Sequence, residues 1–226
     1  MAEQKAAPKL VITPEFVATY VNLEKPRAFV GKNGKPQGDP KYGFTALFDK
    51  SNVEAMKPLY AAAAEVAKAK WPGIEQAELQ AMLKRTFKDG DKEAARLMAR
   101  KSNPKSEAKV AYLKGKVVVK ATSTNPIDCS EAAAQGAAEI LDWKKIYSGM
   151  LGKAELNFVA YDNSFGDEDN EAGGARGFIT VYCNFFLKTK DGQRIGGRDR
   201  NSVWGGVQGG VSTHNPLKDL DDDIPF

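Results

Sequence analysis

The sequence predicts a mainly β protein of the α+β class, namely a small β-barrel with a helical insertion and a disordered acidic C-terminal tail. Three observations lead to this prediction. Several runs alternate between apolar and polar residues, as half-buried strands do. An Ala-rich block of helical character lies between them, and a Gly-rich stretch leads into an acidic end. A sandwich of the same strands is the alternative, because these patterns contain no strand order.

The first strand is expected over residues 11–23, which are rich in β-branched and aromatic residues. Pro14 marks a bulge or a sheet edge there, since proline cannot donate to a strand ladder. Residues 25–40 contain several Gly and Pro residues, which predict a loop or a hairpin turn. Residues 42–48 form the second expected strand.

The helical insertion is expected over about residues 51–101, within a first domain of residues 1–204. Ser51 and Glu54 have the spacing of a capping box, and an Ala-rich helix follows to about Lys70. Two more helices are expected after it, because turn sequences rich in Pro, Gly and Asn divide the block into three. These helices cover residues 74–87 and 91–101.

Three further strands are expected in the second half of the chain, at residues 109–123, 152–162 and 177–190. Residues 130–141 predict a short helix or an irregular Ala-rich connection. Residues 205–226 are expected to form a flexible linker and an acidic tip, because the stretch is first rich in Gly and then in Asp.

Size and composition exclude several classes of protein. A chain of 226 residues can bury a core without disulfides or a structural metal, and no apolar stretch is long enough to span a membrane. The first residues lack the apolar segment of a secretory signal, and Cys129 and Cys183 are expected to be reduced and buried, which fits a cytoplasmic location. His214 is the single histidine, so neither a His-based triad nor a His/Cys zinc site is expected. No cofactor or metal is predicted.

The charge of the chain is distributed unevenly. The formal net charge is +4 at pH 7, and residues 217–226 contain one Lys and four Asp, a net charge of −3, which leaves +7 on the remainder. A basic body with an acidic end is typical of a protein that binds a polyanion. The alternative interpretation is that the acidic end only improves solubility.

A basic face is expected on the strand at residues 109–123. Because successive side chains of a strand point to opposite faces, one face of this strand carries an aromatic ring and three lysines. These residues are Tyr112, Lys114, Lys116 and Lys120. The opposite face is apolar and belongs to the core. The alternative interpretation is an edge strand whose lysines prevent aggregation.

Further aromatic and basic residues complete a predicted groove. Proteins bind single-stranded nucleic acid by stacking bases on aromatic rings and by placing Lys or Arg along the phosphates. The stacking candidates are Tyr42, Phe44, Tyr161 and Tyr182, and the phosphate-clamping candidates are Arg194 and Arg198. Each aromatic residue, taken alone, fits the protein core equally well, so the prediction rests on the whole set.

A magnesium-dependent nuclease is the main enzymatic alternative. Asp128 and the sequence Asp142-Trp143-Lys144 resemble a pattern of one acid followed by an acid and a lysine, which binds magnesium and positions a water. The spacing is loose, and Asp128 lies in a segment without regular periodicity. The sequence therefore favours a protein that is not an enzyme.

The last six residues carry the most specific signal. They resemble the C-terminal tip of bacterial single-stranded DNA-binding proteins at all six positions, and they are Asp221, Asp222, Asp223, Ile224, Pro225 and Phe226. In that family the tip docks replication, recombination and repair enzymes. An aromatic end with a carboxylate, an apolar pair and an acidic run suits a shallow apolar cleft surrounded by basic residues.

The body of the chain resembles phage-encoded single-stranded DNA-binding proteins. The matching stretches are residues 114–123, 146–162 and 177–197. The resemblance implies an OB-fold-like barrel with extra helices, and a protein that binds single-stranded DNA without sequence preference in phage DNA replication, recombination or repair. It implies a location in the host cytoplasm, away from membranes, and docking of host or phage replication and repair proteins on the tip. A homodimer is left open, and an interaction hub without DNA affinity is the other alternative.

Overall fold

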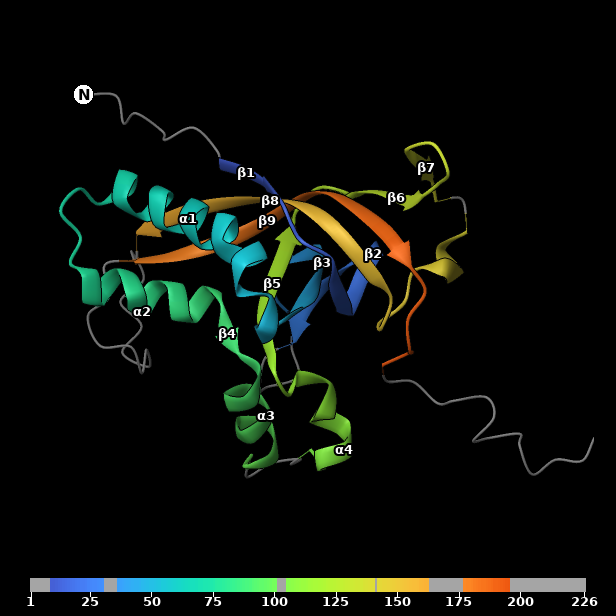
Figure 1. The fold of residues 1–226 in the computed structure, drawn as a ribbon, viewed down its shortest axis with the longest axis horizontal. Coiled ribbons are helices and arrows are strands. Elements are labelled where there is room, and N and C mark those ends of the chain that lie inside the picture. Colours follow the sequence, from blue (N-terminus) through green and yellow to red (C-terminus); the bar gives the residue numbers. More distant parts are fainter. Residues whose placement is uncertain (1–8, 31–35, 101–104, 141, 163–176, 196–226) are drawn as a thin grey trace, which may run out of the picture. The chain divides into compact units, whose positions relative to one another are not determined.

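The strands of the computed structural model pair into one sheet (Figure 1). The structure describes residues 9–30, 36–100, 105–140, 142–162 and 177–195. The strands are β1 (Lys9–Ile12), β2 (Phe16–Val30), β3 (Pro36–Asp49), β4 (Lys88–Asp89), β5 (Lys116–Ser123), β6 (Asp128–Ala132), β7 (Ala137–Glu139), β8 (Leu151–Asp162) and β9 (Gly177–Lys190). Their order is β1-β8-β2-β3-β5-β9-β6-β7, with β4 beside β5 and with a further pairing between β8 and β9.

The α-helices all lie between β3 and β5 in the sequence. They are α1 (Val53–Lys70), α2 (Gln76–Thr86), α3 (Gly90–Met98) and α4 (Glu107–Val110), with short 3-10 turns η1 (Lys50–Asn52), η2 (Ala111–Leu113) and η3 (Trp143–Lys145). The chain divides into two units, Met1–Ile195 and Gly196–Phe226. The second unit, which includes Arg198 and the six tip residues, lies outside the described residues.

Five of the strands pair in a closed circuit. β2 pairs with β3, β3 with β5 and β8 with β9 in antiparallel ladders, and β9 lies parallel to β5 where Thr122 meets Tyr182. The circuit returns to its start because the beginning of β8 pairs with the beginning of β2, at Gly152 and Phe16. Each of these strands therefore has one inner and one outer face.

Aromatic rings fill the inside of the circuit. Phe16 of β2 stacks on Phe44 of β3 with ring centroids 5.3 Å apart, and Phe186 of β9 meets Phe44 edge-on at 5.1 Å. Phe48 meets Phe16 in the same edge-on way. Ala46 lies between the two phenylalanines of β3, and all five residues are buried. The interior is therefore closely packed rather than open.

Helices α1 and α2 cover the face of the β8–β9 ladder that continues the interior of the circuit (Figure 1). The buried side of α1 is made of small and apolar residues, and its Leu59 belongs to the same apolar cluster as Phe158 of β8. At the end of α2, the Thr86 hydroxyl donates a hydrogen bond to the carbonyl oxygen of Ile179, 3.5 Å away. The two helices thus extend the core beyond the circuit.

A second, smaller apolar cluster joins α3, α4 and η2 to the outer side of β3 and β5. Leu47 and Val118 contribute to it from the sheet, and the other buried members are Ala94, Leu97, Val110 and Leu113. The carboxylate of Asp89 accepts hydrogen bonds from two backbone N–H groups in the first turn of α3, and Lys50 donates to it at 2.8 Å. Such a cap satisfies N–H groups that have no partner within the helix. We call this part the α3–α4 lobe.

One extra residue in β9 reverses the faces of its second half. Strict alternation along residues 177–190 predicts two faces. The apolar face is made of Ile179, Val181, Cys183, Phe185 and Leu187, and the mixed polar and aromatic face is made of Thr180, Tyr182, Asn184, Phe186 and Lys188. In the structure the register against β8 shifts by one residue at Asn184, which is a β-bulge. Phe186 consequently points into the core, and Phe185 is 54% exposed. The predicted apolar face is therefore correct up to Cys183 and wrong beyond it.

Two local expectations are wrong, and a third is correct only in part. Residues 25–40, expected as a loop or a hairpin turn, do belong to the β2–β3 hairpin, but most of them lie in its strands. Residues 130–141, expected as helical or irregular, contain parts of β6 and the whole of β7. The expected capping box does not form, because the Ser51 hydroxyl donates to Asp49 Oδ1 at 2.7 Å and η1 precedes α1.

The two cysteines are free and buried, as predicted. Burial raises the pKa of the Cys129 thiol to about 12, and it raises the pKa of Cys183 as well. Both therefore stay protonated near neutral pH. In the described part of the chain, none of the helices is long and apolar enough to cross a membrane.

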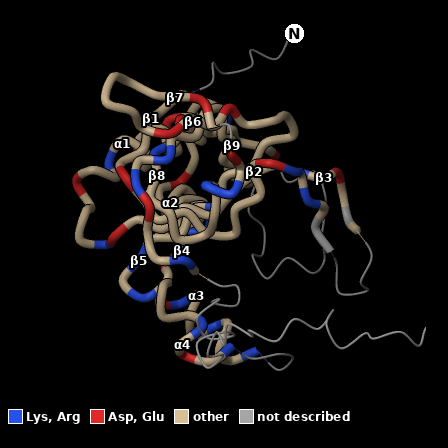
Figure 2. The backbone as a smooth tube through the Cα atoms, turned by 90° about the vertical axis from the view of Figure 1, so that its right-hand side faces the viewer, with Lys and Arg blue, Asp and Glu red and all other residues tan. Residues whose placement is uncertain are grey.

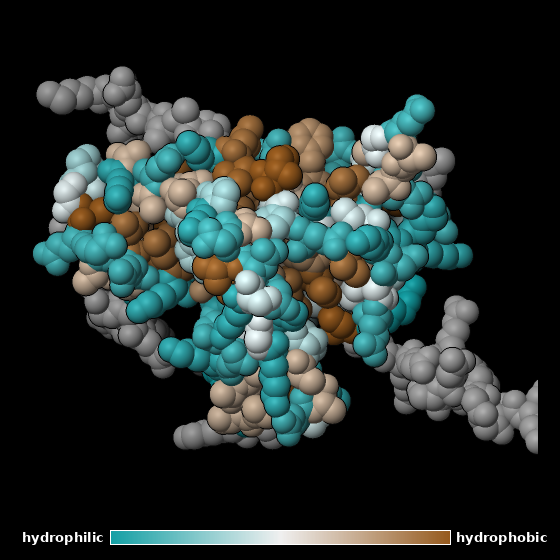
Figure 3. All heavy atoms as spheres, in the orientation of Figure 1, coloured by the Kyte–Doolittle hydropathy of each residue, from teal (hydrophilic) through white to brown (hydrophobic). Residues whose placement is uncertain are grey.

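β1 forms one edge of the sheet. Its Leu10 and Ile12 side chains are largely exposed, and Figure 3 shows apolar atoms gathered along this side of the molecule. The strand is only four residues long, and short edges limit pairing with other chains.

Candidate nucleic-acid interface

The outer face of the circuit runs across β3, β5, β9 and β8. Thr45 pairs with Lys120, Thr122 pairs with Tyr182, and Tyr182 pairs in turn with Asn157. Residues directly opposite each other share a face, so these side chains form one continuous surface, which we call the outer face. Asn157 Oδ1 is buried and has no hydrogen-bond partner among the described residues.

Three aromatic rings lie together on the β8–β9 part of this face. Tyr161 and Phe178 stack with ring centroids 5.7 Å apart and an interplanar angle of 25°. The hydroxyls of Tyr161 and Tyr182 are 3.0 Å apart, so one donates to the other. Tyr161 is 40% exposed and Phe178 is 46% exposed, so both rings keep area open to a ligand. We call these three residues the aromatic trio.

Burial and the hydrogen bond to Tyr161 raise the pKa of Tyr182 to about 12. The Tyr182 hydroxyl therefore stays protonated near neutral pH and carries no negative charge that would repel a phosphate.

The sequence predicts Tyr161 and Tyr182 for the interface but not Phe178. Phe178 pairs with Tyr161 and lies four residues before Tyr182 on β9, so it shares their face. The alternation that places Tyr182 identifies Phe178 as well, once the mixed face of this strand is extended back to its first residues.

Lys120 is an exposed lysine of the outer face, and no ion-pair partner for it is found among the described residues. By contrast, Lys116 donates to Asp49 at 2.7 Å and Lys114 forms an ion pair with Glu107. Hydrogen bonds from these lysines hold the pKa of Asp49 and that of Glu107 below their usual values. Of the three predicted lysines, Lys120 is thus the one whose charge is not shared with a described carboxylate.

Tyr112 and Lys114 do not lie on a strand. Residues 109–115, expected as the start of one, contain the end of α4 and η2, and β5 begins only at Lys116. The face inferred from alternation is therefore wrong for these two residues. Tyr112 is half-buried against the α3–α4 lobe, and its hydroxyl is 2.9 Å from that of Tyr20.

Phe44 and Tyr42 belong to the inner face of β3. Phe44 is 2% exposed, and its ring is enclosed by those of Phe16 and Phe186. It therefore has no ring face open to a base, and it drops out of the interface. Tyr42 is half-buried against the same core.

Arg194 lies at the opposite end of the β8–β9 ladder from the aromatic trio. Its guanidinium lies over the ring of Tyr147, 4.1 Å from the centroid. The Tyr147 hydroxyl donates to Asp191 at 2.9 Å, and Lys188 forms an ion pair with Asp191 at 2.7 Å. The structure therefore does not bring Arg194 together with the tyrosines predicted beside it. The companion residue Arg198 lies outside the described residues.

The β2–β3 hairpin carries charges of both signs, with Lys25, Arg27 and Lys41 near Glu24 and Asp39 in the sequence (Figure 2). Arg27 and Lys41 pair directly across it. Like charges opposite each other destabilise a ladder, so this pair favours an anion nearby. At the base of the hairpin, a small pocket is lined by residues 21–25, Arg27, Trp143 and Ile146.

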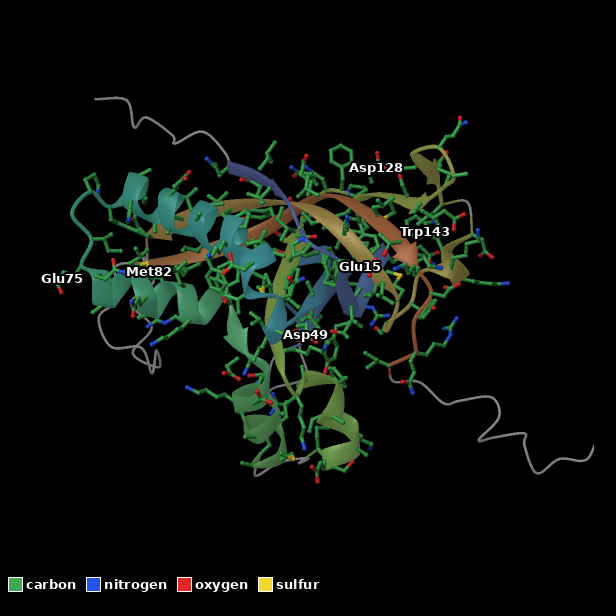
Figure 4. The ribbon with its side chains drawn as sticks, in the orientation of Figure 1. Glu15, Asp49, Glu75, Met82, Asp128 and Trp143 are labelled. Atoms are coloured by element: carbon green, nitrogen blue, oxygen red, sulfur yellow. The ribbon has the colours of Figure 1, made fainter. Side chains whose placement is uncertain are left out.

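The acids of the nuclease pattern lie on separate segments. Asp128 begins β6, whereas Asp142 precedes η3 and accepts a hydrogen bond from the backbone N–H of Lys144 at 2.9 Å. Figure 4 labels Asp128 and Trp143 on these two segments. The described residues contain no group of three or more His, Cys, Asp or Glu arranged to hold a metal ion.

Comparisons by sequence and by structure lead to the same phage protein. Residues 9–205 match the family model of the ssDNA-binding protein of Enterobacter phage Enc34. The single-stranded DNA-binding protein from bacteriophage Enc34, solved in complex with ssDNA, is 20% identical, has a TM-score of 0.55, and the match covers 86% of this chain and 100% of that chain. A second structure of the same phage protein is 20% identical with a TM-score of 0.53, covering 85% of this chain and 88% of that one.

No protein with a curated description matches the sequence. The resemblance to phage-encoded single-stranded DNA-binding proteins is nevertheless confirmed, because the family model spans most of the chain. The chain belongs to the family of the Enterobacter phage Enc34 ssDNA-binding protein.

Proposed function

We propose that this protein binds single-stranded DNA without sequence preference through its outer face. The observation that carries the proposal is the aromatic trio, which shares a sheet face with the exposed Lys120. Open rings can stack on any base, since every base has a flat face, and a lysine can contact the phosphates between them. The Enc34 protein solved in complex with ssDNA supports the choice of ligand.

We also propose that the circuit of β2, β3, β5, β9 and β8 is a barrel of the OB type. Counted in chain order, its strands pair as first, second, third, fifth and fourth, and the fourth closes on the first. OB folds are five-stranded Greek-key barrels that bind oligonucleotides on their second and third strands and on adjoining loops. Here the second and third strands are β3 and β5, and Lys120 lies on the latter.

The β2–β3 hairpin corresponds to one of those adjoining loops. Arg27 and Lys41, which pair across it, would then contact the phosphates of a strand that extends beyond the outer face. Neutralising both residues should weaken binding to all sequences alike.

Fluorescence anisotropy of a labelled oligo-dT tests the proposal, with a mixed-sequence oligonucleotide of the same length beside it. We expect saturable binding of both. Lys120→Glu should weaken binding strongly, because it reverses a charge on the outer face. Lys68→Glu is the matched control, since it makes the same change on the exposed side of α1. Equal losses in the two variants would contradict the outer face as the site, and no binding by the wild-type protein would favour the interaction hub.

We further propose that residues 221–226 dock proteins of replication, recombination or repair. The support is their sequence, in which an acidic run precedes Ile224, Pro225 and the terminal Phe226. Removing Phe226 alone takes away the aromatic anchor and keeps the acidic run. We expect this variant to lose binding to host enzymes that recognise bacterial single-stranded DNA-binding tips, and to keep its affinity for oligo-dT. Retained docking would overturn this part of the proposal.

A further inference from the structure

Tyr20 has a backbone conformation that tyrosine rarely adopts. Its φ is +49°, and no other non-glycine residue in the described ranges has a positive φ. A bulky residue in the left-handed region is a genuine outlier, because its Cβ crowds the carbonyl oxygen that follows. The fold therefore holds Tyr20 in a strained state.

A β-bulge imposes this conformation. Thr19 pairs with Thr45 and Asn22 pairs with Gly43, so three steps along β2 lie opposite two steps along β3. In bulges with a left-handed first residue, that position is usually glycine. Here a tyrosine occupies it, and the bulge redirects its side chain.

Packing does not account for the choice of tyrosine. Tyr20 is 65% exposed, and it belongs to neither of the two apolar clusters. Its hydroxyl lies 2.9 Å from that of Tyr112, and this hydrogen bond is exposed to water. Exposed hydrogen bonds of this kind contribute little to folding, because water offers the same partners. Glycine or asparagine would suit the backbone better, so the ring indicates a function outside folding.

The position of Tyr20 links it to the outer face. Thr19 of β2 pairs with Thr45 of β3, which pairs with Lys120 of β5. Asn22 of β2 pairs with Gly43, and the same row continues through Thr122 to Tyr182 of β9. Tyr20 lies in the bulge between Thr19 and Asn22. It therefore stands at the β2 border of the outer face, whereas the aromatic trio lies on β8 and β9.

We propose that Tyr20 is a further base-stacking residue, held outward by the bulge at the border opposite the aromatic trio. The inference rests on the proposed binding of single-stranded DNA. The bound strand runs from the aromatic trio across Lys120 to Tyr20. An exposed aromatic ring at each end and a lysine between them match the alternation of bases and phosphates along such a strand.

Tyr20→Asn separates this role from a structural one. Asparagine tolerates the left-handed conformation and removes the ring. We expect the affinity for oligo-dT to fall roughly 5- to 150-fold, the effect of losing one stacked base. The Tm should stay the same or rise, because the strain is relieved. Tyr20→Phe keeps the ring, loses the hydroxyl, and should retain most of the affinity.

Phe185→Ala is the matched control. Phe185 is also an exposed ring, at 54%, but it pairs with Asp128 and Glu155, whose charges repel phosphates. Its removal should leave the affinity unchanged. Wild-type affinity in Tyr20→Asn, an equal loss in Tyr20→Phe, or a lowered Tm in Tyr20→Asn would each overturn the inference. Failure of the proposed function itself would appear separately, as an absence of saturable binding by the wild-type protein.

Discussion

Lys116 and Lys120 lie on the same strand, yet their surroundings differ. Lys116 donates to Asp49, a residue 67 positions away in the sequence, whereas Lys120 is exposed without a described partner. Alternation assigns both lysines to one face, because it predicts the face to which each side chain points. It does not predict which carboxylates lie near that side chain. The prediction therefore placed both lysines on one face of the same strand, but it could not distinguish the paired lysine from the unpaired one.

The ion pair between Asp49 and Lys116 should make stability depend on pH. Hydrogen bonds from Lys116 and Ser51 hold the pKa of Asp49 well below its usual value. A carboxyl with a depressed folded pKa stabilises the fold above its unfolded pKa, and this contribution is lost as the pH falls. We expect the Tm of the wild type to exceed that of Asp49→Asn by a constant amount above about pH 5, and the gap to shrink below about pH 4. Thermal denaturation followed by circular dichroism measures the gap, and a gap independent of pH would contradict the ion pair.

The buried cysteines should resist thiol reagents. Burial raises the pKa of Cys129 to about 12, and that of Cys183 also rises, so both lack the reactive thiolate. We expect a disulfide reagent at about pH 8 to modify neither thiol in the folded protein and both in denaturant. Rapid modification of the native protein would show that one of the two thiols is accessible.

At the scale of elements, the sequence predicted most strands and helices, and its errors have identifiable causes. The strand at residues 177–190 has the predicted bounds. A single inserted residue is invisible to a pattern of period two, so the bulge at Asn184 reversed the faces after it. Residues 25–40 contain many turn-forming residues but extend the hairpin, since pairing with the opposite strand outweighs local propensity there.

The bulge at Asn184 predicts opposite effects for two adjacent phenylalanines. Phe186→Ala should lower the free energy of unfolding by about 3–5 kcal/mol, because it empties a site in the aromatic core. Phe185→Ala should change it by less than about 0.5 kcal/mol, because that ring faces solvent. Denaturant unfolding of both variants measures the difference. The reverse order would mean that the faces of β9 follow simple alternation.

At the scale of the whole molecule, the family and its ligand class followed from a resemblance rather than from periodicity. The strand order in particular depends on pairings between distant segments, such as β5 with β9, and no local pattern encodes these. The sequence predicted only part of the arrangement of the candidate site. Tyr161, Tyr182 and Lys120 lie on one face, whereas Phe44 is in the core and Arg194 is at the other end of the ladder.

The salt dependence of binding should measure how many phosphates the protein neutralises. For single strands, the logarithm of the association constant falls with the logarithm of the salt concentration by about 0.7 per phosphate neutralised. Lys120→Ala should reduce the slope by about 0.7, whereas Lys68→Ala should leave it unchanged. Titrations at several salt concentrations measure the slopes, and equal slopes for the wild type and Lys120→Ala would remove Lys120 from the phosphate path.

The junction between β5 and β9 has the shortest ladder of the circuit, since the two strands pair there at the single position of Thr122 and Tyr182. A DNA strand that contacts both Lys120 of β5 and Tyr182 of β9 would span this junction and hold the two strands together. A ligand that binds only when β5 and β9 are paired lowers, by mass action, the population of molecules in which this pairing is broken. Amide hydrogens of residues 121–123 should therefore exchange more slowly in the complex, whereas those of α1 change little. Binding of single-stranded DNA and pairing of β5 with β9 would then be thermodynamically coupled, so that each stabilises the other.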